Sequence, residues 1–179
     1  MNQTEQLFRE IKFVPYGKEH DHKTVQWLND PRIAKAFGLT HAITMKSHRK
    51  WIESQKNYYI WAIYDQQEIH QGNVSLTYNP KHHSAYFQLY IGEQQARGRG
   101  IGYTALLFAM KYAFETLNVH RLSLHVFPDN PAAIHLYQKA GFQKEGVERE
   151  AHYNDGHFRD QLSYSILYRE WEERKGEKE

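Results

Sequence analysis

Residues 94–102, written QQARGRGIG, place three glycines within five positions. They follow an apolar, strand-like stretch, SAYFQLYIG at residues 84–92. They precede a stretch in which apolar residues recur at helical spacing, at Ile101, Ala105, Phe108 and Tyr112. A strand, a glycine-rich turn and a helix amino terminus bring unpaired backbone N–H groups and the positive end of the helix dipole together. The stretch therefore predicts an anion-binding loop, in which glycine lets a phosphate approach the backbone.

The spacing of this loop separates it from two other nucleotide-binding loops. A Walker loop ends in Gly-Lys-Ser/Thr, where this chain has Ile101, Gly102 and Tyr103. A dinucleotide-binding fingerprint lies near the start of a chain and is followed, about 20 residues later, by a carboxylate on a parallel strand. A loop that comes after several antiparallel strands fits this arrangement poorly. A flexible basic loop, with glycines for turn geometry alone, stays open on these residues.

The rest of the chain reads as alternating strands and helices. Predicted strands cover residues 8–14, 58–64, 68–78, 84–92, 121–127, 143–149 and 161–168. The strands before the loop predict an antiparallel meander, in which Gly72 indicates a bulge or a close approach of two backbones. Predicted helices cover residues 20–29, 44–55 and 100–117, the first two joined by the segment 31–41. A further helix begins after Asn130 as N-cap, with Pro131 at its first position and Gly141 at its end.

Length and composition suit a single compact domain, residues 1–170, followed by a charged tail, residues 171–179, that we expect to fray. Lys and Arg number 23 against 21 Asp and Glu, and a formal charge of +2 is too balanced to indicate a nucleic-acid-binding protein. The chain has no cysteine, which excludes disulfides, thiolate metal sites and a cysteine nucleophile. The first residues lack a secretory signal pattern, and no apolar run is long enough to span a bilayer. We therefore expect a soluble, cytoplasmic protein that binds neither membrane nor nucleic acid.

At the loop the chain resembles the GCN5-related N-acetyltransferases, the GNAT family. Their signature, Gln/Arg-x-x-Gly-x-Gly/Ala, is matched position for position by residues 95–100. A second family element is similar to residues 130–142, with Asn130, Ala133, Tyr137 and the Ala140-Gly141-Phe142 helix exit in the expected places. The resemblance is close over residues 72–167 and looser before them. It implies an α/β (α+β) fold, with a mixed, mostly antiparallel sheet of six to seven strands flanked by about four helices.

The resemblance also implies acetyl-coenzyme A as co-substrate and direct transfer of its acetyl group to a primary amine. In the family the loop amides hold the pyrophosphate of coenzyme A, and here Arg97 and Arg99 would add positive charge beside it. The expected cofactor-binding residues are Ile91, Gln95, Arg97, Gly98, Arg99, Gly100, Ile101, Gly102, Asn130 and Tyr137.

Direct transfer needs a neutral amine, a stabilised oxyanion and a proton for the departing thiolate. In the family a tyrosine on the helix after the asparagine commonly supplies this proton, and Tyr137 occupies that position. The alternative role of Tyr137 is aromatic packing between helix and sheet. Asn130 is a good N-cap in any protein, and in the family this residue also often contacts the cofactor.

The general base is open, because many relatives carry a glutamate on the strand where this chain has Tyr86 and Gln88. The candidates are Glu93 beside the loop, His125 on the next strand and an ordered water; a histidine's near-neutral pKa range suits an acceptor ammonium. His125 could equally be a partly exposed histidine without a role. No metal is expected, because the 12 histidines show no HExxH or comparable spacing.

The segment 27–54 usually walls the acceptor site in this fold, and here it resembles acetyltransferases that act on amino-sugar nucleotides. Its residues Lys46, His48, Arg49 and Lys50 form a basic stretch that suits a nucleotide diphosphate, unless they are merely a solvated helix face. The part from Glu145 on is similar to spermidine and ribosomal-protein N-terminal acetyltransferases, so these acceptors stay open. A coenzyme A sensor without turnover, and a homodimer through an exposed carboxy-terminal strand edge, also remain open.

Overall fold

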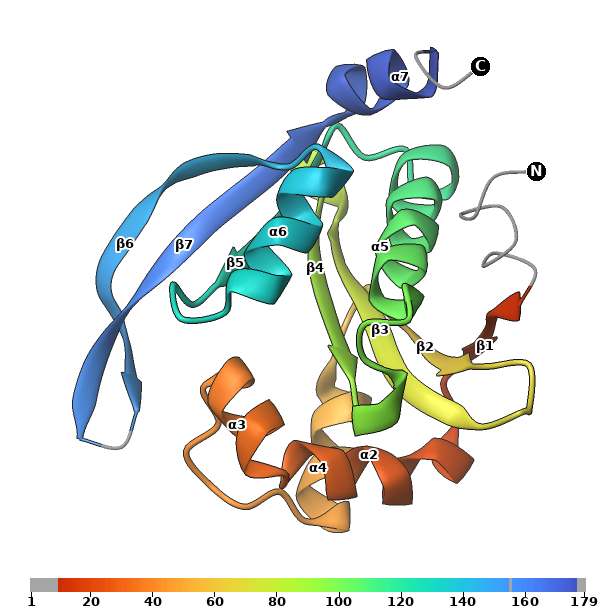
Figure 1. Ribbon diagram of the computed structural model, residues 1–179, viewed down its shortest axis with the longest axis vertical. Helices are drawn as coiled ribbons and strands as arrows, with labels where there is room; N and C mark the ends of the chain where they lie inside the picture. The colour runs from red at the N-terminus through yellow and green to blue at the C-terminus, as the bar shows by residue number, and fades with distance from the viewer. Residues whose placement is uncertain (1–9, 155, 177–179) are drawn as a thin grey trace.

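The structure is a computed structural model in which residues 10–154 and 156–176 are described. Seven strands form one sheet in the order β1-β2-β3-β4-β5-β7-β6 (Figure 1). They are β1 (Lys12–Pro15), β2 (Tyr58–Tyr64), β3 (His70–Asn79), β4 (Ser84–Ile91), β5 (Arg121–Val126), β6 (Gln143–Asn154) and β7 (His157–Leu167). Among the described strands only β4 and β5 are parallel neighbours, so the mixed, mostly antiparallel sheet is confirmed.

Six α-helices among the described residues accompany the sheet, against about four expected. They are α2 (Asp21–Leu28), α3 (Pro31–Phe37), α4 (Met45–Ser54), α5 (Ile101–Lys111), α6 (Pro131–Ala140) and α7 (Tyr168–Gly176). Figure 1 shows α5 and α6 side by side over one face of the sheet, α2, α3 and α4 together at one end, and α7 at the other end. The helical segment expected over 100–117 divides into α5 and a π-helical turn, η4 (Tyr112–Thr116).

The core lies between the sheet and the two helices on its face. Phe87 of β4 and Leu122 of β5 are almost completely buried there, as are Ala105 and Ala109, which lie four residues apart on α5. Residues four apart share one face of a helix, and these small side chains face the core of the sheet. This packing fixes α5 and α6 on the sheet, and with them the glycine loop that precedes α5.

The meander before the loop has the expected antiparallel pairing, and β2 has the bounds expected from the sequence. At Gly72 the backbones of β3 and β4 approach so closely that a Cβ would clash with the carbonyl oxygen of Tyr90. A register shift next to Tyr64 lies opposite this position. The expectation of a bulge with a close approach is confirmed. The first strand begins at Lys12, and residues 8 and 9 of its expected range lie outside the described residues.

The helix expected after Asn130 has the predicted ends. The Asn130 side chain accepts a hydrogen bond from the Ala133 N–H at 3.2 Å, Pro131 is the first helical residue, and Gly141 closes the helix with a φ of 98°. This capping fixes the start of α6 beside the carboxyl end of β5.

The segment 31–41, expected to be a plain connection, contains helix α3. The Asp30 side chain accepts from the Arg32 N–H at 2.9 Å, Pro31 is the first helical residue and Gly38 ends the helix with a φ of 65°. These are the same start and stop signals that identified α6. The expectation of a plain connection is therefore wrong, because local capping residues encode a helix in this segment.

The tail and the last hairpin are also more ordered than expected. Residues 168–176 form α7, and Trp171 is buried with its ring stacked on Phe114 at a centroid distance of 5.0 Å. Fraying is therefore wrong for residues 171–176, and residues 177–179 lie outside the described residues. Strands β6 and β7 extend through most of the region expected to be a turn.

Candidate active site

The site is centred where β4 and β5 separate. Their parallel pairing covers three residue pairs and ends at Tyr86 and Ser123. Beyond this point lies a cavity of about 120 Å³, the strand slot, lined by residues that include Phe37, Tyr86, Phe87, Gln88, Leu89, His125, Asn130 and Tyr137. Successive residues of a strand face opposite sides of a sheet. The lining includes residues from both faces of β4, Phe87 and Leu89 on one face and Tyr86 and Gln88 on the other. The slot therefore connects the two faces of the sheet.

A second cavity of about 540 Å³, the loop cleft, lies between the glycine loop, α6 and α3. The predicted cofactor residues on its wall are Ile91, Arg97, Gly98, Gly100, Gly102, Asn130 and Tyr137. The first hydrogen bond into α5 runs from the Thr104 N–H to the Gly100 carbonyl at 3.0 Å, which leaves the N–H groups of the first turn available. The loop cleft thus has the donors that a phosphate group requires.

The loop geometry fits a phosphate in a second respect. Gly98 and Gly100 have φ values of 75° and 82°, which side chains of L-residues rarely allow. At Gly98 no described atom beyond the adjoining residues lies within 4 Å of an ideal Cβ position, so the backbone is open to a ligand. The residues present therefore fit the pyrophosphate that the sequence pattern indicates.

Three predicted cofactor residues lie elsewhere. Arg99 and Ile101 line a separate small cavity beside Asp65, and Ile101 is buried in the core. Gln95 lies in the turn η3 (Gln94–Ala96), is exposed, and lines neither the loop cleft nor the strand slot. Arg97 therefore lines the loop cleft, whereas Arg99 lines the separate cavity.

Tyr137 lies at the junction of the loop cleft and the strand slot and lines both. Its ring meets that of Phe87 edge to face, with centroids 6.2 Å apart. Burial, and to a lesser degree the nearby Tyr86, raise the pKa of the Tyr137 hydroxyl well above its ordinary value. The hydroxyl therefore remains a proton donor at neutral pH. Asn130 combines its capping role with a position on both cavity walls.

The candidate bases differ in position. The Glu93 carboxylate pairs with Lys23 at 2.9 Å, and Glu93 lines neither cavity. His125 lines the strand slot, with Nδ1 3.3 Å from the Tyr86 hydroxyl and Nε2 2.7 Å from a Glu148 carboxylate oxygen. The structure thus brings His125, but not Glu93, to the cavity that contains Tyr137.

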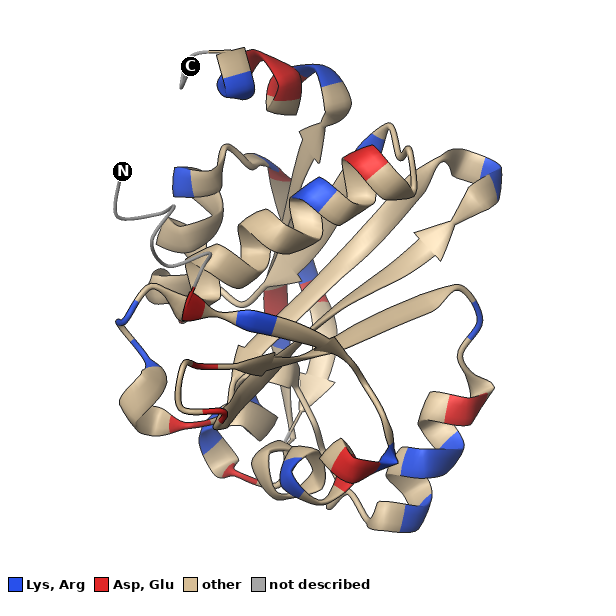
Figure 2. Ribbon diagram, turned by 90° about the vertical axis from the view of Figure 1, so that its right-hand side faces the viewer, with Lys and Arg blue, Asp and Glu red and all other residues tan. Residues whose placement is uncertain are grey.

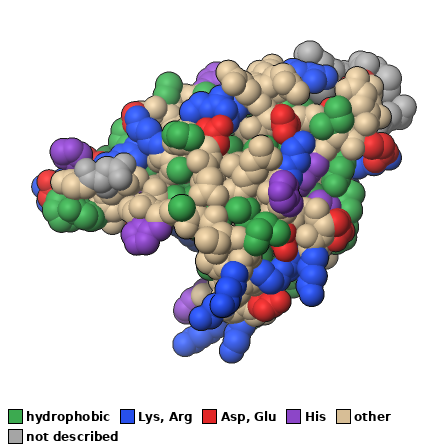
Figure 3. Space-filling model, turned by 90° about the horizontal axis from the view of Figure 1, so that it is seen from below, with side chains coloured by type: hydrophobic (Ala, Val, Ile, Leu, Met, Phe, Trp, Pro, Cys, Tyr) green, Lys and Arg blue, Asp and Glu red, His purple; other side chains and the backbone are tan. Residues whose placement is uncertain are grey.

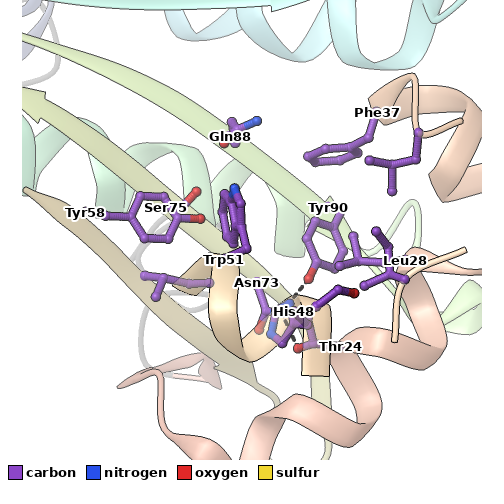
Figure 4. A pocket seen from close by; sticks show the side chains of 14 residues that line it. Thr24, Leu28, Phe37, His48, Trp51, Tyr58, Asn73, Ser75, Gln88 and Tyr90 are labelled. Atoms are coloured by element: carbon purple, nitrogen blue, oxygen red, sulfur yellow. Dashed lines mark hydrogen bonds between the residues drawn. The ribbon is translucent and has the colours of Figure 1, made fainter. Parts of the chain in front are cut away.

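A third cavity of about 450 Å³, the α4 pocket, lies between the sheet and the helices α2 to α4 (Figure 4). Its lining residues are Thr24, Leu28, Phe37, Leu39, Ile43, Ser47, His48, Trp51, Tyr58, Ile60, Asn73, Ser75, Gln88 and Tyr90. None of them is a carboxylate, a lysine or an arginine. Gln88 and Phe37 also line the strand slot, so the α4 pocket adjoins the slot on the face of the sheet opposite α5 and α6.

A hydrogen-bonded polar group forms one side of the α4 pocket. The Asn73 amide nitrogen donates to the Thr24 hydroxyl at 2.8 Å and to the Tyr90 hydroxyl at 2.6 Å (Figure 4). Burial raises the pKa of Tyr90, so its hydroxyl remains neutral. His48 is buried beside Asp21, and burial lowers its pKa despite that carboxylate. These polar groups are therefore uncharged at neutral pH.

The basic stretch on α4 is smaller than the sequence suggested. His48 is buried, and Arg49 forms an ion pair with the buried Asp21 carboxylate. Lys46 and Lys50 are exposed and form no ion pair with any described residue. Figures 2 and 3 show basic residues gathered at the end of the molecule that contains α3 and α4. Two free lysines therefore lie on the helix that walls the α4 pocket.

Sequence reasoning missed several residues of the site, above all Phe37, Asn73 and Tyr90. Phe37 could have been found from the capping signals of α3, which place it on the last turn of that helix. Asn73 and Tyr90 face each other across β3 and β4, and only the strand register shows it. Within the described residues, no three His, Asp or Glu side chains are placed to hold a metal ion, and no helix has the length and apolar character to cross a bilayer.

Comparison with known proteins agrees with this geometry. Residues 11–143 match a family model described as an acetyltransferase (GNAT) domain. The chain is 32% identical to the acetyltransferase PseH of Campylobacter jejuni over 135 residues, which cover 73% of this chain and 81% of PseH. It is 43% identical to a spermidine N(1)-acetyltransferase of Vibrio cholerae over 61 residues, 34% of this chain and 35% of that protein. The crystal structure of spermidine N-acetyltransferase from Vibrio cholerae in complex with CoA and spermine superposes with a TM-score of 0.85, at 24% identity, over 91% of this chain and 98% of that one.

Proposed function

Because this chain belongs to the GNAT acetyltransferase family, and is an acetyl-coenzyme A-dependent N-acetyltransferase, we propose that its acceptor is the primary amine of an amino-sugar nucleotide. The observation that carries this proposal is the uncharged, aromatic α4 pocket, whose wall includes the rings of Phe37, Trp51, Tyr58 and Tyr90. Sugar rings pack on aromatic faces and use neutral hydrogen-bonding groups for orientation. The similarity to PseH over most of both chains supports the same class of acceptor.

The charges around the α4 pocket support the nucleotide part of the acceptor. Lys46 and Lys50 are exposed on the helix that walls the pocket and have no carboxylate partner among the described residues. A lysine ammonium is a point charge that suits phosphate oxygens. A nucleotide diphosphate would lie outside the pocket toward these lysines, with the amino sugar inside.

A polyamine is less well supported as acceptor. Sequence similarity to a spermidine acetyltransferase supports it, but that similarity extends over only 34% of the chain. A polycation needs carboxylates, and the lining of the α4 pocket has none. The nearest buried carboxylate, Asp21, is already paired with Arg49.

The strand slot separates the acid and the base of the transfer on the two faces of the sheet. Bound acetyl-coenzyme A supplies the electrophilic thioester carbonyl. The amine enters from the α4 pocket, and His125 accepts the proton that the ammonium loses. Tyr137 donates its proton to the departing sulfur on the opposite side, while the loop amides and Arg97 hold the phosphates. A carbon–nitrogen bond forms, the carbon–sulfur bond breaks, and the proton that the acylated nitrogen loses replaces the one given by Tyr137.

The test is release of free thiol from acetyl-coenzyme A by the full chain, with a panel of acceptors. The panel contains a UDP-linked 4-amino sugar, the same amino sugar without nucleotide, spermidine and an N-terminal ribosomal-protein peptide. We expect kcat/KM for the nucleotide-linked sugar to exceed that for every other acceptor at least tenfold, about 1.4 kcal/mol of discrimination. Faster turnover of spermidine or the peptide would reassign the acceptor. Binding of acetyl-coenzyme A without any turnover would favour a sensor.

A pair of charge variants tests the nucleotide contact. Lys46→Glu combined with Lys50→Glu should raise KM for the nucleotide-linked sugar and leave that for the free amino sugar unchanged. Lys81→Glu is the matched control, because Lys81 is exposed on the turn between β3 and β4, at the other end of those strands. Equal effects on both sugars would show that the lysines do not read the nucleotide.

A homodimer remains a proposal about the assembly. Strand β6 lies at one edge of the sheet, and Val147, Tyr153 and Phe158 on the last hairpin are exposed apolar residues. Such an edge with apolar side chains favours pairing with a second chain. Light scattering during size-exclusion chromatography measures the mass in solution, and a monomer mass would reject the dimer.

A further inference from the structure

The open face of β5, β7 and β6 carries two ion pairs that each cross the middle strand, β7. Arg121 of β5 pairs with Glu145 of β6 through two hydrogen bonds of 2.5 Å. His125, four residues along β5, pairs with Glu148 of β6 at 2.7 Å. The first pair lies away from the three cavities, whereas the second includes a residue of the strand slot.

We propose that Glu148 is a positioning residue that holds His125 in one tautomer and thereby makes it the base of the transfer. A carboxylate accepts hydrogen bonds but cannot donate them, so the 2.7 Å contact requires the proton to reside on Nε2. The other ring nitrogen, Nδ1, is then an acceptor. It lies 3.3 Å from the hydroxyl of Tyr86, which lines the strand slot. The inference rests on the transfer function proposed above.

Local features of the chain allow Glu148 to reach across a strand. His125 pairs with Ser163 of β7, and the short serine side chain leaves room above the middle strand. Regular pairing of β6 is interrupted directly after Glu148, where the register shifts and Glu150 adopts a φ of 53°. The Glu150 N–H donates to the Asp160 carboxylate at 2.8 Å, which fixes this irregularity. Bulges redirect neighbouring side chains and are frequent next to active sites.

The proton path follows from these contacts. The acceptor ammonium in the slot gives a proton to the Tyr86 hydroxyl, and Tyr86 passes its own proton to Nδ1 of His125. The resulting imidazolium is stabilised by the Glu148 carboxylate and later loses a proton to solvent. The ring of His125 is partly exposed, so water can reach it, and no oxidant or second co-substrate is needed.

Other charged groups near His125 are already paired. Arg159 of β7 and Lys35 of α3 both contact the Asp129 carboxylate, at 2.8 Å and 3.2 Å. From β4 the facing titratable group is Tyr86, whereas Tyr137 of α6 lines the slot from the other face of the sheet. Within this environment Glu148 is the carboxylate in contact with the His125 ring.

The first test reads the tautomer directly and needs no acceptor. Long-range ¹H–¹⁵N correlation spectra of the full chain report the two ring nitrogens of each histidine, and His125→Gln identifies the signals of His125. We expect a proton on Nε2 and an unprotonated Nδ1 in the wild type. In Glu148→Ala the two nitrogen shifts should move toward each other, while the matched variant Glu145→Ala should leave them unchanged. An Nδ1-protonated ring in the wild type, or a Glu148→Ala spectrum identical to it, would overturn the proposal.

The second test is kinetic, with Glu148→Gln compared with Glu145→Gln on the acceptor identified above. We expect Glu148→Gln to lower kcat roughly tenfold with an unchanged KM for acetyl-coenzyme A, because the variant loses orientation of the base and not cofactor binding. Glu145→Gln should leave kcat unchanged. If His125→Ala is inactive but Glu148→Gln has the same kinetics as Glu145→Gln, the positioning role of Glu148 is rejected and the role of His125 as base is not. Full activity of His125→Ala would instead reject the base assignment in the proposed function.

Discussion

The rings of Phe37 and Tyr90 meet edge to face, at right angles and with centroids 5.3 Å apart. Both residues line the α4 pocket and the loop cleft, so this contact is a partition between the two cavities. Tyr90 is held by its hydrogen bond to Asn73, whereas Phe37 belongs to a short helix at the surface. The position of α3 therefore decides how well the two cavities are separated.

Phe37→Ala should remove this partition. Loss of the ring opens a path between the cavities, so water reaches the slot and the acceptor is held less firmly. We expect acetyl-coenzyme A hydrolysis without acceptor to rise several-fold and KM for the acceptor to rise about tenfold. Thiol release with and without acceptor measures both. Phe37→Leu, which retains apolar volume, should be close to the wild type, and a similar leak in that variant would contradict a simple partition.

Tyr137→Phe removes the proposed proton donor while it retains the ring that packs on Phe87. General acid catalysis contributes on the order of 100-fold or more, so kcat should fall by that factor while the dissociation constant of coenzyme A stays the same. Tyr103→Phe is the matched control, because Tyr103 lines the same loop cleft on α5 but does not line the strand slot. A proportional loss of cofactor affinity in Tyr137→Phe would instead indicate a structural tyrosine.

Gly98→Val tests the cofactor loop against a matched position. Gly98 and Gly156 have φ values of 75° and 80°, and apart from the adjoining residues no described atom lies within 4 Å of an ideal Cβ at either position. Valine at either site costs about 1–2 kcal/mol of backbone strain, but only at Gly98 does the side chain enter the loop cleft. Calorimetric titration with coenzyme A should show at least tenfold weaker binding for Gly98→Val and little change for Gly156→Val. Equal weakening would mean that strain alone is responsible.

The parts of the molecule that depend on neighbouring residues could be predicted from the sequence. Residues close by in the sequence encode the glycine loop, the caps at Asn130 and Gly141, and the strands of the meander. The capping signals at Asp30 and Gly38 are equally local, and α3 was within reach of the same reasoning.

The parts that depend on partners far along the chain could not be predicted. Glu93 appeared available in the sequence, but Lys23, from a helix 70 residues away, neutralises it. His125 appeared isolated, because its partner Glu148 lies two strands away in the sheet. His48 appeared to be part of a basic surface, and burial beside Asp21 makes it a neutral residue of the pocket wall. In each case a tertiary contact decides which partner the side chain meets, and the spacing of residues in the sequence does not reveal that contact.

Two buried histidines make stability depend on pH. Burial lowers the pKa of His48 and of His70 below the ordinary value of about 6.5. Both are therefore neutral in the folded state, whereas in the unfolded chain they bind protons below about pH 6.5. Since the unfolded state binds more protons, the free energy of unfolding decreases as the pH falls below that value. Each group contributes a slope of up to about 1.4 kcal/mol per pH unit until its folded pKa is reached.

We therefore expect urea unfolding, followed by circular dichroism, to show a loss of about 1–2 kcal/mol between pH 7 and pH 5.5. The strongly paired carboxylates do not interfere, because Asp30 and Glu145 have pKa values of about 2 and lose their contribution only at lower pH. His70→Gln should flatten the dependence, because a side chain that does not titrate replaces the buried imidazole. His22→Gln, at an exposed position of α2, should leave it unchanged. If the free energy of unfolding of the wild type stays constant between pH 7 and pH 5.5, the two histidines bind protons as readily in the folded state as in the unfolded state, and the prediction is wrong.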